Sequence, residues 1–131
     1  RMSSELIVDE LTGRASAGSI AVTAEGGTNT TNLQQGLAKA WINYKTAATF
    51  VNNDSFNIAS ITDEGTGQVL HNFTNAMSNT FFSYIGMSNE FTATGSLTNK
   101  SSSTARQHSY NTSDAAADTN ENNTAVHGDL A

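Results

Sequence analysis

The stretch WINYKTAATFVNNDSFNIASITDEGTGQVLHNFTNAM, residues 41–77, carries the clearest structural signal of the sequence, because bulky apolar and small polar residues alternate along most of its length. Alternation with a period of two is the pattern of a half-buried strand. Ile42 and Tyr44 share one strand face, and Val69 and Phe73 share another. The run DEGTG between them has the glycines and acidic residues of a hairpin turn. The segment therefore predicts antiparallel strands joined by tight turns.

The strand pattern continues on the C-terminal side of this segment. TFFSYIGMS, residues 80–88, predicts a further strand, and a weaker one spans Phe91 to Leu97. Beyond Leu97 small polar residues dominate, which favours either a long surface loop with a short strand around residues 105–111 or a flexible stretch. A closing strand passes through Val126. Several short strands separated by turn signals predict a mainly β chain with an antiparallel β-sandwich head.

The N-terminal part predicts a different kind of structure. Residues 1–30 contain the apolar patch ELIV and the run SIAVT, which predict two short strands of an anchoring or oligomerisation segment. Residues 31–131 would then form a short helix followed by the sandwich domain. Leu33, Leu37 and Trp41 recur every four residues, which is helical periodicity over two to three turns. Thr31 or Asn32 is a suitable N-cap for that helix.

The apolar residues of this N-terminal part have few neighbours within one chain. A hairpin on its own is marginally stable in water, so it must pack on other surfaces. The sequence favours two arrangements of the Leu33, Leu37 and Trp41 stripe equally. The helix could lie on the sheet of its own chain, or its narrow apolar stripe could pack against other copies around a three-fold axis. The second arrangement predicts a homotrimer with an oligomer interface at Leu6, Val8, Ile20, Val22, Leu33, Leu37 and Trp41.

Composition and charge exclude several classes of function. The net charge is −6 and only 6 residues are Lys or Arg, so no basic cluster is present to bind nucleic acid phosphates. The chain has no cysteine, which excludes disulfides and thiolate metal sites. No apolar run approaches the roughly 18 residues that span a bilayer, so we expect no membrane insertion.

Reactive side chains form no recognisable catalytic or metal-binding motif. His71, His108 and His127 have no spacing typical of metal ligands, and the DEGTG run lacks the alternate oxygen ligands of a calcium loop. We therefore expect no enzymatic activity, no catalytic residue, no metal and no cofactor. Loops rich in Tyr, Ser and Asn hydrogen-bond adaptably. They predict a receptor-facing loop that contains Asn99, Tyr110, Asn111 and Asn122.

Four motifs in a fixed order resemble a module of tailed-bacteriophage structural proteins, above all of tail-fibre C-terminal regions. They are Lys-Ala-Trp-Ile-Asn at 39–43, Ser-Phe-Asn-Ile at 55–58, Ile-Thr-Asp-Glu-Gly-Thr-Gly at 61–67, and Asn-Phe-Thr-Asn-Ala-Met at 72–77. The chain departs from the module at TAAT, residues 46–49, where a Gly-Thr pair is common. The region after Leu97 has no counterpart.

The resemblance implies a homotrimeric, non-enzymatic virion protein that assembles in the cytoplasm of a bacterial host. It would be displayed on the surface of the particle, attached to other tail or capsid proteins. It would serve host attachment through a bacterial surface saccharide or protein.

A capsid decoration (cement) protein, which reinforces the shell, is the alternative. A free carbohydrate-binding module ranks below both, and a depolymerase ranks last because the acidic residues lie at turns and at both ends.

Overall fold

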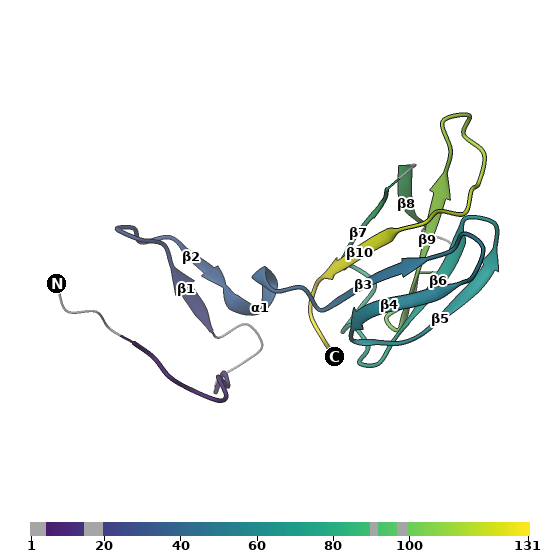
Figure 1. The fold of residues 1–131 in the computed structure, drawn as a ribbon. Helices are drawn as coiled ribbons and strands as arrows, with labels where there is room; N and C mark the ends of the chain where they lie inside the picture. The colour runs from purple at the N-terminus through teal and green to yellow at the C-terminus, as the bar shows by residue number, and fades with distance from the viewer. Residues whose placement is uncertain (1–4, 15–19, 90–91, 97–99) are drawn as a thin grey trace. The chain divides into compact units, whose positions relative to one another are not determined.

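The computed structural model describes residues 5–14, 20–89, 92–96 and 100–131, and it is mainly β, with 48% strand and 4% helix (Figure 1). The predicted antiparallel β class is therefore confirmed. Backbone contacts divide the chain into two compact units, Arg1–Gly36 and Leu37–Ala131. The sequence analysis placed this division after residue 30, which is the first residue of a strand. Among the described residues, no helix is both long and apolar enough to cross a membrane.

The described part of the first unit contains one small antiparallel hairpin and a single helical turn. Strand β1 (Ala21–Thr23) pairs with β2 (Thr30–Asn32), and helix α1 (Leu33–Gly36) follows directly. The side-chain Oδ1 of Asn32 accepts a hydrogen bond of 3.2 Å from the backbone N–H of Gln35. Asn32 therefore caps the helix as predicted, because it satisfies an N–H that has no partner within the helix.

Two predictions for the N-terminal part are wrong. Residues 5–14 form no strand, so the apolar patch over Leu6 to Val8 is not the first strand of the hairpin. The helix has one turn rather than two or three, and Trp41 lies in strand β3. The strand prevails because residues 40–45 gain a hydrogen-bonded neighbour on each side, whereas a short isolated helix is marginal in water.

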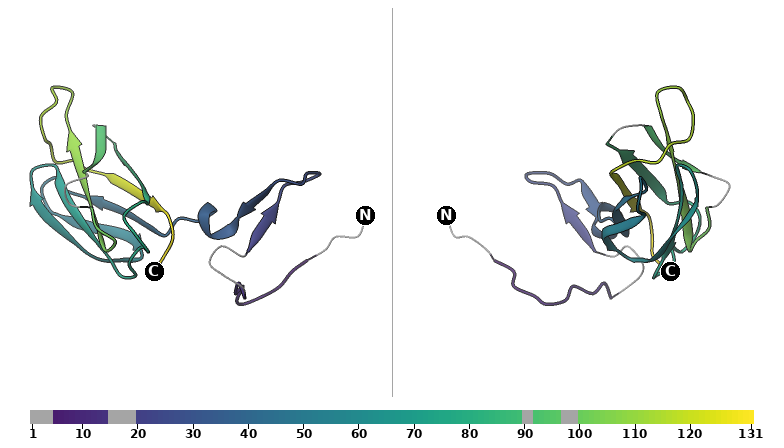
Figure 2. Two further views of the ribbon diagram at one scale, coloured as in Figure 1. Left: turned by 180° about the vertical axis from the view of Figure 1, so that it is seen from behind. Right: turned by 45° about the vertical axis from the view of Figure 1, so that its right-hand side comes forward.

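The second unit contains two four-stranded sheets in which every pairing is antiparallel (Figures 1 and 2). The first sheet has the order β4-β3-β10-β7, with β3 at Ala40–Lys45, β4 at Val51–Phe56, β7 at Ser83–Ser88 and β10 at Asn122–His127. The second sheet has the order β5-β6-β9-β8, with β5 at Ile58–Gly65, β6 at Gln68–Phe73, β8 at Thr92–Ser96 and β9 at Thr104–Tyr110.

Alternate residues of the central strands are buried, as the period of two predicts. In β3 every second residue from Ala40 onward is buried, and in β6 the buried positions begin at Val69. The two sheets share an apolar core, because one cluster contains residues of both sheets and of the connections between strands: Ala40, Phe73, Met77, Phe82, Ala105 and Val126. A second, smaller cluster consists of Ile42, Tyr44 and Val69.

The long connection from β9 to β10, residues 111–121, is hydrogen-bonded to two other parts of the unit. The backbone N–H of Gly67, in the β5–β6 turn, donates to Oδ1 of Asp118 at 2.7 Å. The backbone N–H groups of Thr46 and Ala47 both donate to the carbonyl oxygen of Thr119, at 3.0 and 2.9 Å. This polar part of the chain is thus a surface loop held by hydrogen bonds from main-chain N–H groups of other segments, and the predicted short strand before it is present as β9.

Candidate interaction surface

The first sheet carries a row of apolar side chains on the face that points away from the shared core. Strand register places Trp41 of β3 opposite Phe56 of β4 and Ala125 of β10, and it places Ala125 opposite Ile85 of β7. Phe56 is 52% exposed, Trp41 38% and Ile85 53%. Met87, two residues along β7 and 67% exposed, extends the row. These five residues, Phe56, Trp41, Ala125, Ile85 and Met87, are called the apolar row below.

The apolar row is hollowed at its centre. A groove of about 290 Å³ is lined by Trp41 on β3, by Ala125 on β10, and by Ile85 and Met87 on β7. Because β10 lies between β3 and β7, the small side chain of Ala125 forms the floor between larger neighbours. Contiguous exposed apolar surface of this kind marks a binding site more often than an inert surface does.

An amide ladder borders the apolar row on the same face. Nδ2 of Asn53 donates to Oδ1 of Asn43 at 2.7 Å, and Nδ2 of Asn43 donates to Oδ1 of Asn123 at 2.7 Å. Nδ2 of Asn123 in turn donates to Oε1 of Glu121 at 3.2 Å. The register shifts between Asn43 and Tyr44, and this irregularity brings Asn53 beside Asn43. The polar side chains next to the row are therefore bonded to one another.

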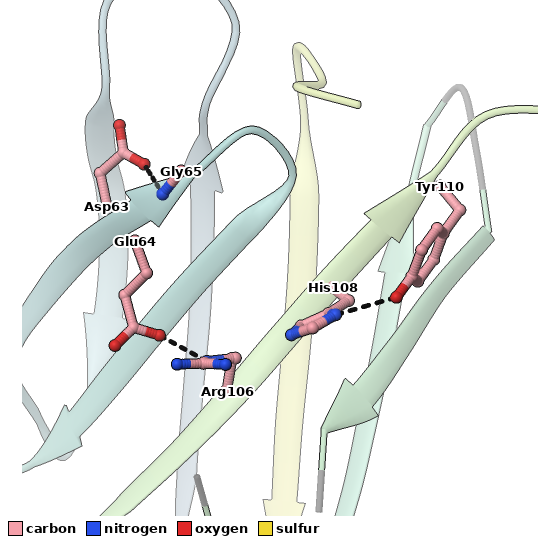
Figure 3. A network of polar contacts seen from close by, with 6 residues as sticks. All are labelled: Asp63, Glu64, Gly65, Arg106, His108 and Tyr110. Atoms are coloured by element: carbon pink, nitrogen blue, oxygen red, sulfur yellow. Dashed lines mark hydrogen bonds and ion pairs between the residues drawn. The ribbon is translucent and has the colours of Figure 1, made fainter. Parts of the chain in front are cut away.

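The outer face of the second sheet is polar instead. Arg106, His108 and Tyr110 alternate along β9, and Arg106 forms an ion pair with Glu64 of β5 (Figure 3). Nδ1 of His108 lies 2.9 Å from the hydroxyl oxygen of Tyr110. Partial burial lowers the pKa of His108, and the positive charge of Arg106 lowers it further, while Glu64 acts in the opposite direction. The outer face of the first sheet thus carries the apolar row beside bonded polar side chains, whereas β9 of the second sheet presents an ion pair and a His–Tyr contact.

One asparagine connects three of the four sequence motifs. Asn57, between β4 and β5, has a positive φ of 56°, a conformation that Asn tolerates better than most residues. Its Nδ2 donates to the carbonyl oxygens of Lys39 at 2.9 Å and of Asn75 at 3.1 Å, and its Oδ1 accepts from the backbone N–H of Asn75 at 2.7 Å. The motifs at 39–43, 55–58 and 72–77 therefore meet at this side chain.

Polar side chains also link the two sheets inside the core. Nδ1 of His71, which is fully buried, lies 2.8 Å from the hydroxyl oxygen of Tyr84. Tyr84 also hydrogen-bonds Thr124, and Oγ1 of Thr124 donates to Oε1 of Gln107. Burial raises the pKa of Tyr84 and lowers the pKa of His71 to about 4. His71 is therefore neutral in the folded protein at neutral pH.

The buried state of His71 predicts a loss of stability in mild acid. The unfolded chain binds a proton at His71 near pH 6.5, whereas the folded chain binds it only near pH 4. Stability is therefore complete above pH 6.5 and falls by about 1.4 kcal/mol per pH unit between these values, or about 3 kcal/mol in total. The measurement is urea unfolding from pH 7.5 to pH 3.5, with His71→Gln as the control.

The difference between the two unfolding curves isolates His71, because the two proteins differ at no other ionisable group. Equal slopes for the native chain and His71→Gln would show that burial of this imidazole does not resist protonation.

The residues predicted for an oligomer interface lie mostly in the first unit. Leu6 is 78% exposed, and Val8 and Val22 are each 52% exposed, while Ile20 and Leu33 are half-buried. Leu37, 53% exposed, and Trp41 belong to the second unit. Trp41 is the one residue of this set that lies in the apolar row. The sequence analysis does not predict a surface role for Phe56, Ile85 and Met87. Their positions in alternating strands are the sequence feature that could have indicated one.

The residues predicted for a receptor-facing loop do not form one surface. Asn122 lies within β10 and is fully buried, so the prediction that it faces a receptor is wrong. Its Oδ1 accepts a hydrogen bond of 3.1 Å from the hydroxyl of Ser109 inside the core. Tyr110 ends β9, and Oδ1 of Asn111 accepts from the backbone N–H of Ser113 in the adjoining turn. Asn99 lies outside the described residues.

Among the residues that the structure describes, no group of three or more His, Cys, Asp or Glu side chains is arranged to hold a metal ion. A second hollow, of about 510 Å³, is lined by Thr80, Phe81, Phe82 and Lys100. Nζ of Lys100 there donates to the carbonyl oxygen of Phe82 and lies 4.1 Å from the centre of its ring. This lysine is thereby held against Phe82.

Comparison of the chain with protein-family models, with curated proteins and with solved structures gave no match in any of the three.

Proposed function

We propose that this chain is a non-enzymatic surface protein of a tailed-bacteriophage virion. It would be a homotrimeric, fibre- or spike-like protein in which the second unit forms a β-sandwich head, and it would serve attachment to a bacterial host. The first unit would anchor the protein to other virion proteins or help to join its copies.

The convergence of the motifs at Asn57 carries this proposal. Three of the motifs are scattered in sequence, and this one side chain joins them in the fold. Asn57 bonds the backbone of Lys39 and of Asn75, and the fourth motif ends at Gly67, where the chain approaches other backbone closely. An ordered match to all four motifs therefore supports the same head architecture as in the phage modules that the chain resembles.

The exposed apolar surface supports the oligomeric part of the proposal. The apolar row on the first sheet would be costly to leave in water, at about 25 cal/mol per Å² of apolar area. The exposed aliphatic side chains at Leu6, Ile7, Val8 and Leu11 add to this cost. Association of copies would reduce both costs, as in the obligate oligomers of virion fibres.

Two measurements on the purified full chain test the proposal. Light scattering after size exclusion should give three times the 13.8 kDa chain mass at micromolar concentration. The trimer should then bind to a bacterial envelope preparation and reduce phage adsorption to those cells. A chain that remains monomeric at about 100 µM contradicts the trimer. Binding to phage capsids at fixed positions, without binding to cells, would instead favour a capsid decoration protein.

A further inference from the structure

We infer that the apolar row on the β4-β3-β10-β7 sheet is the surface through which copies of this chain pack against one another. The inference rests on the proposed homotrimer and names the contact face within it. That face differs from the interface predicted from the sequence, which lay mainly in the N-terminal unit and shared only Trp41 with the row.

The side chains of the row are those that protein interfaces favour. Trp, Phe and Met are enriched in the cores of interfaces, whereas Lys, Glu and Asp are depleted there. The row contains one Trp, one Phe, one Met and one Ile around a central alanine, with no ionisable group among them. The opposite sheet, in contrast, has Arg106, His108 and Glu64 on its outer face (Figure 3).

The neighbouring amide ladder lowers the cost of covering the row. Polar groups that lose water on association destabilise a complex unless they are hydrogen-bonded. Asn43, Asn53 and Asn123 already bond one another and Glu121 through their side chains. A partner that covers the row therefore meets amides whose hydrogen bonds are already supplied in part by the chain itself.

The exposed area of the row is about half of what one subunit contributes to a standard interface. A large side chain has about 150–250 Å² of surface, so the exposed fractions of Phe56, Trp41, Ile85 and Met87 give roughly 400 Å². A standard interface takes about 800 Å² from each partner, of which about 65% is apolar in homodimers. The row thus supplies most of the apolar area that one copy must provide to such an interface.

The shape of the face suits contact between copies. The row crosses all four strands of the sheet, about 15 Å at about 4.8 Å between neighbouring strands, and it contains a groove of about 290 Å³. In a three-fold arrangement, each copy would place its row towards the common axis. The projecting side chains of Ile85 and Met87 would then enter the groove that Trp41 and Ala125 line in the adjacent copy.

The test replaces one projecting side chain at a time. Ile85→Lys and Met87→Lys each place a charge on the row, at positions that are more than half exposed in the single chain. Thr62→Lys, on an exposed position of β5 in the other sheet, is the matched control. Sedimentation of the full chains over a dilution series measures association. We expect both row variants to weaken it at least about 100-fold, because an unpaired charge would be buried, and the control to change it less than about 3-fold.

A second measurement needs no substitution. Trp41 is the sole tryptophan of the chain, so its fluorescence reports on the row alone. On dilution through the dissociation range, its emission should move to longer wavelength and acrylamide should quench it more strongly. Circular dichroism of each variant establishes that the fold is retained, and Met87→Ser is a milder substitution if a lysine variant does not fold.

The outcomes separate this inference from the proposed function. A trimer that persists in both lysine variants, with unchanged Trp41 quenching on dilution, overturns the inference and leaves the trimer intact. The contact would then lie elsewhere, for example at Leu6 to Leu11. A dimer that the row variants dissociate supports the inference and contradicts the trimeric fibre. A chain that stays monomeric at about 100 µM overturns both.

Discussion

Gly67→Ala is expected to destabilise the second unit by about 4 kcal/mol. Gly67 has a φ of +66°, and a Cβ there would lie 2.5 Å from the carbonyl oxygen of Ser109 and 2.7 Å from the backbone nitrogen of Ala117. The left-handed conformation costs about 1–2 kcal/mol for alanine, and a clash with backbone atoms adds about 1–3 kcal/mol. Urea unfolding monitored by circular dichroism measures the change in the free energy of unfolding.

Gly65→Ala is the matched control for this substitution. Gly65 lies in the same turn and also has a positive φ, of 125°, but no atom outside its neighbours lies within 4 Å of a Cβ built there. A φ of 125° lies outside the left-handed α region and is itself unfavourable for alanine, so the control contains a backbone cost without the clash. We expect Gly67→Ala to be the more destabilising of the two by about 2 kcal/mol. Equal effects would mean that the connection between β9 and β10 can move away from the turn.

Asn57→Ala is expected to cost about 4 kcal/mol. The substitution removes three side-chain hydrogen bonds, to Lys39 and Asn75, each with a net value of about 1 kcal/mol. It also places alanine at a φ of 56°, which adds about 1 kcal/mol. Thermal and urea unfolding of the full chain measure the loss, which should appear as a lower transition midpoint with little change in the urea m-value.

Asn57→Gly separates the two contributions, because glycine adopts positive φ without strain but makes no side-chain hydrogen bond. We expect it to be more stable than Asn57→Ala by about 1 kcal/mol. Asn72→Ala, which removes one side-chain hydrogen bond to Ser60, should cost no more than about 1 kcal/mol. If Asn57→Ala were as mild as Asn72→Ala, the junction of the motifs would have no special role in stability.

Local patterns predicted most of the strands. The alternation in β3 and β6, the hairpin turn between β5 and β6, and the N-cap at Asn32 depend on residues close in sequence, and all agree with the structure. The helix length was wrong because Trp41 fits both a period of four and a period of two. The pairing of β3 with its two neighbouring strands favours the strand over the helix. The periodicity around Trp41 alone does not reveal these partner strands.

The candidate surface was harder to predict because it depends on strand order. Trp41 and Ala125 are neighbours on the sheet although 84 positions separate them in sequence, and Ile85 joins them only through β10. The polarity of Asn122 and its neighbours predicts that Asn122 lies in a surface loop. The structure buries it in β10, where Ser109 bonds to it across the core. A polar residue that points into the core can be recognised only when the residue that hydrogen-bonds to it from the other sheet is known.

The position of β10 has a consequence for the order in which the unit is made. β10 lies between β3 and β7, yet it follows every other strand of its unit along the chain. During translation, β3 and β7 therefore leave the ribosome before the strand that joins them exists. The first sheet can close only after residues 122–127 emerge, so the nascent chain must keep both strand edges from pairing with other polypeptides until then.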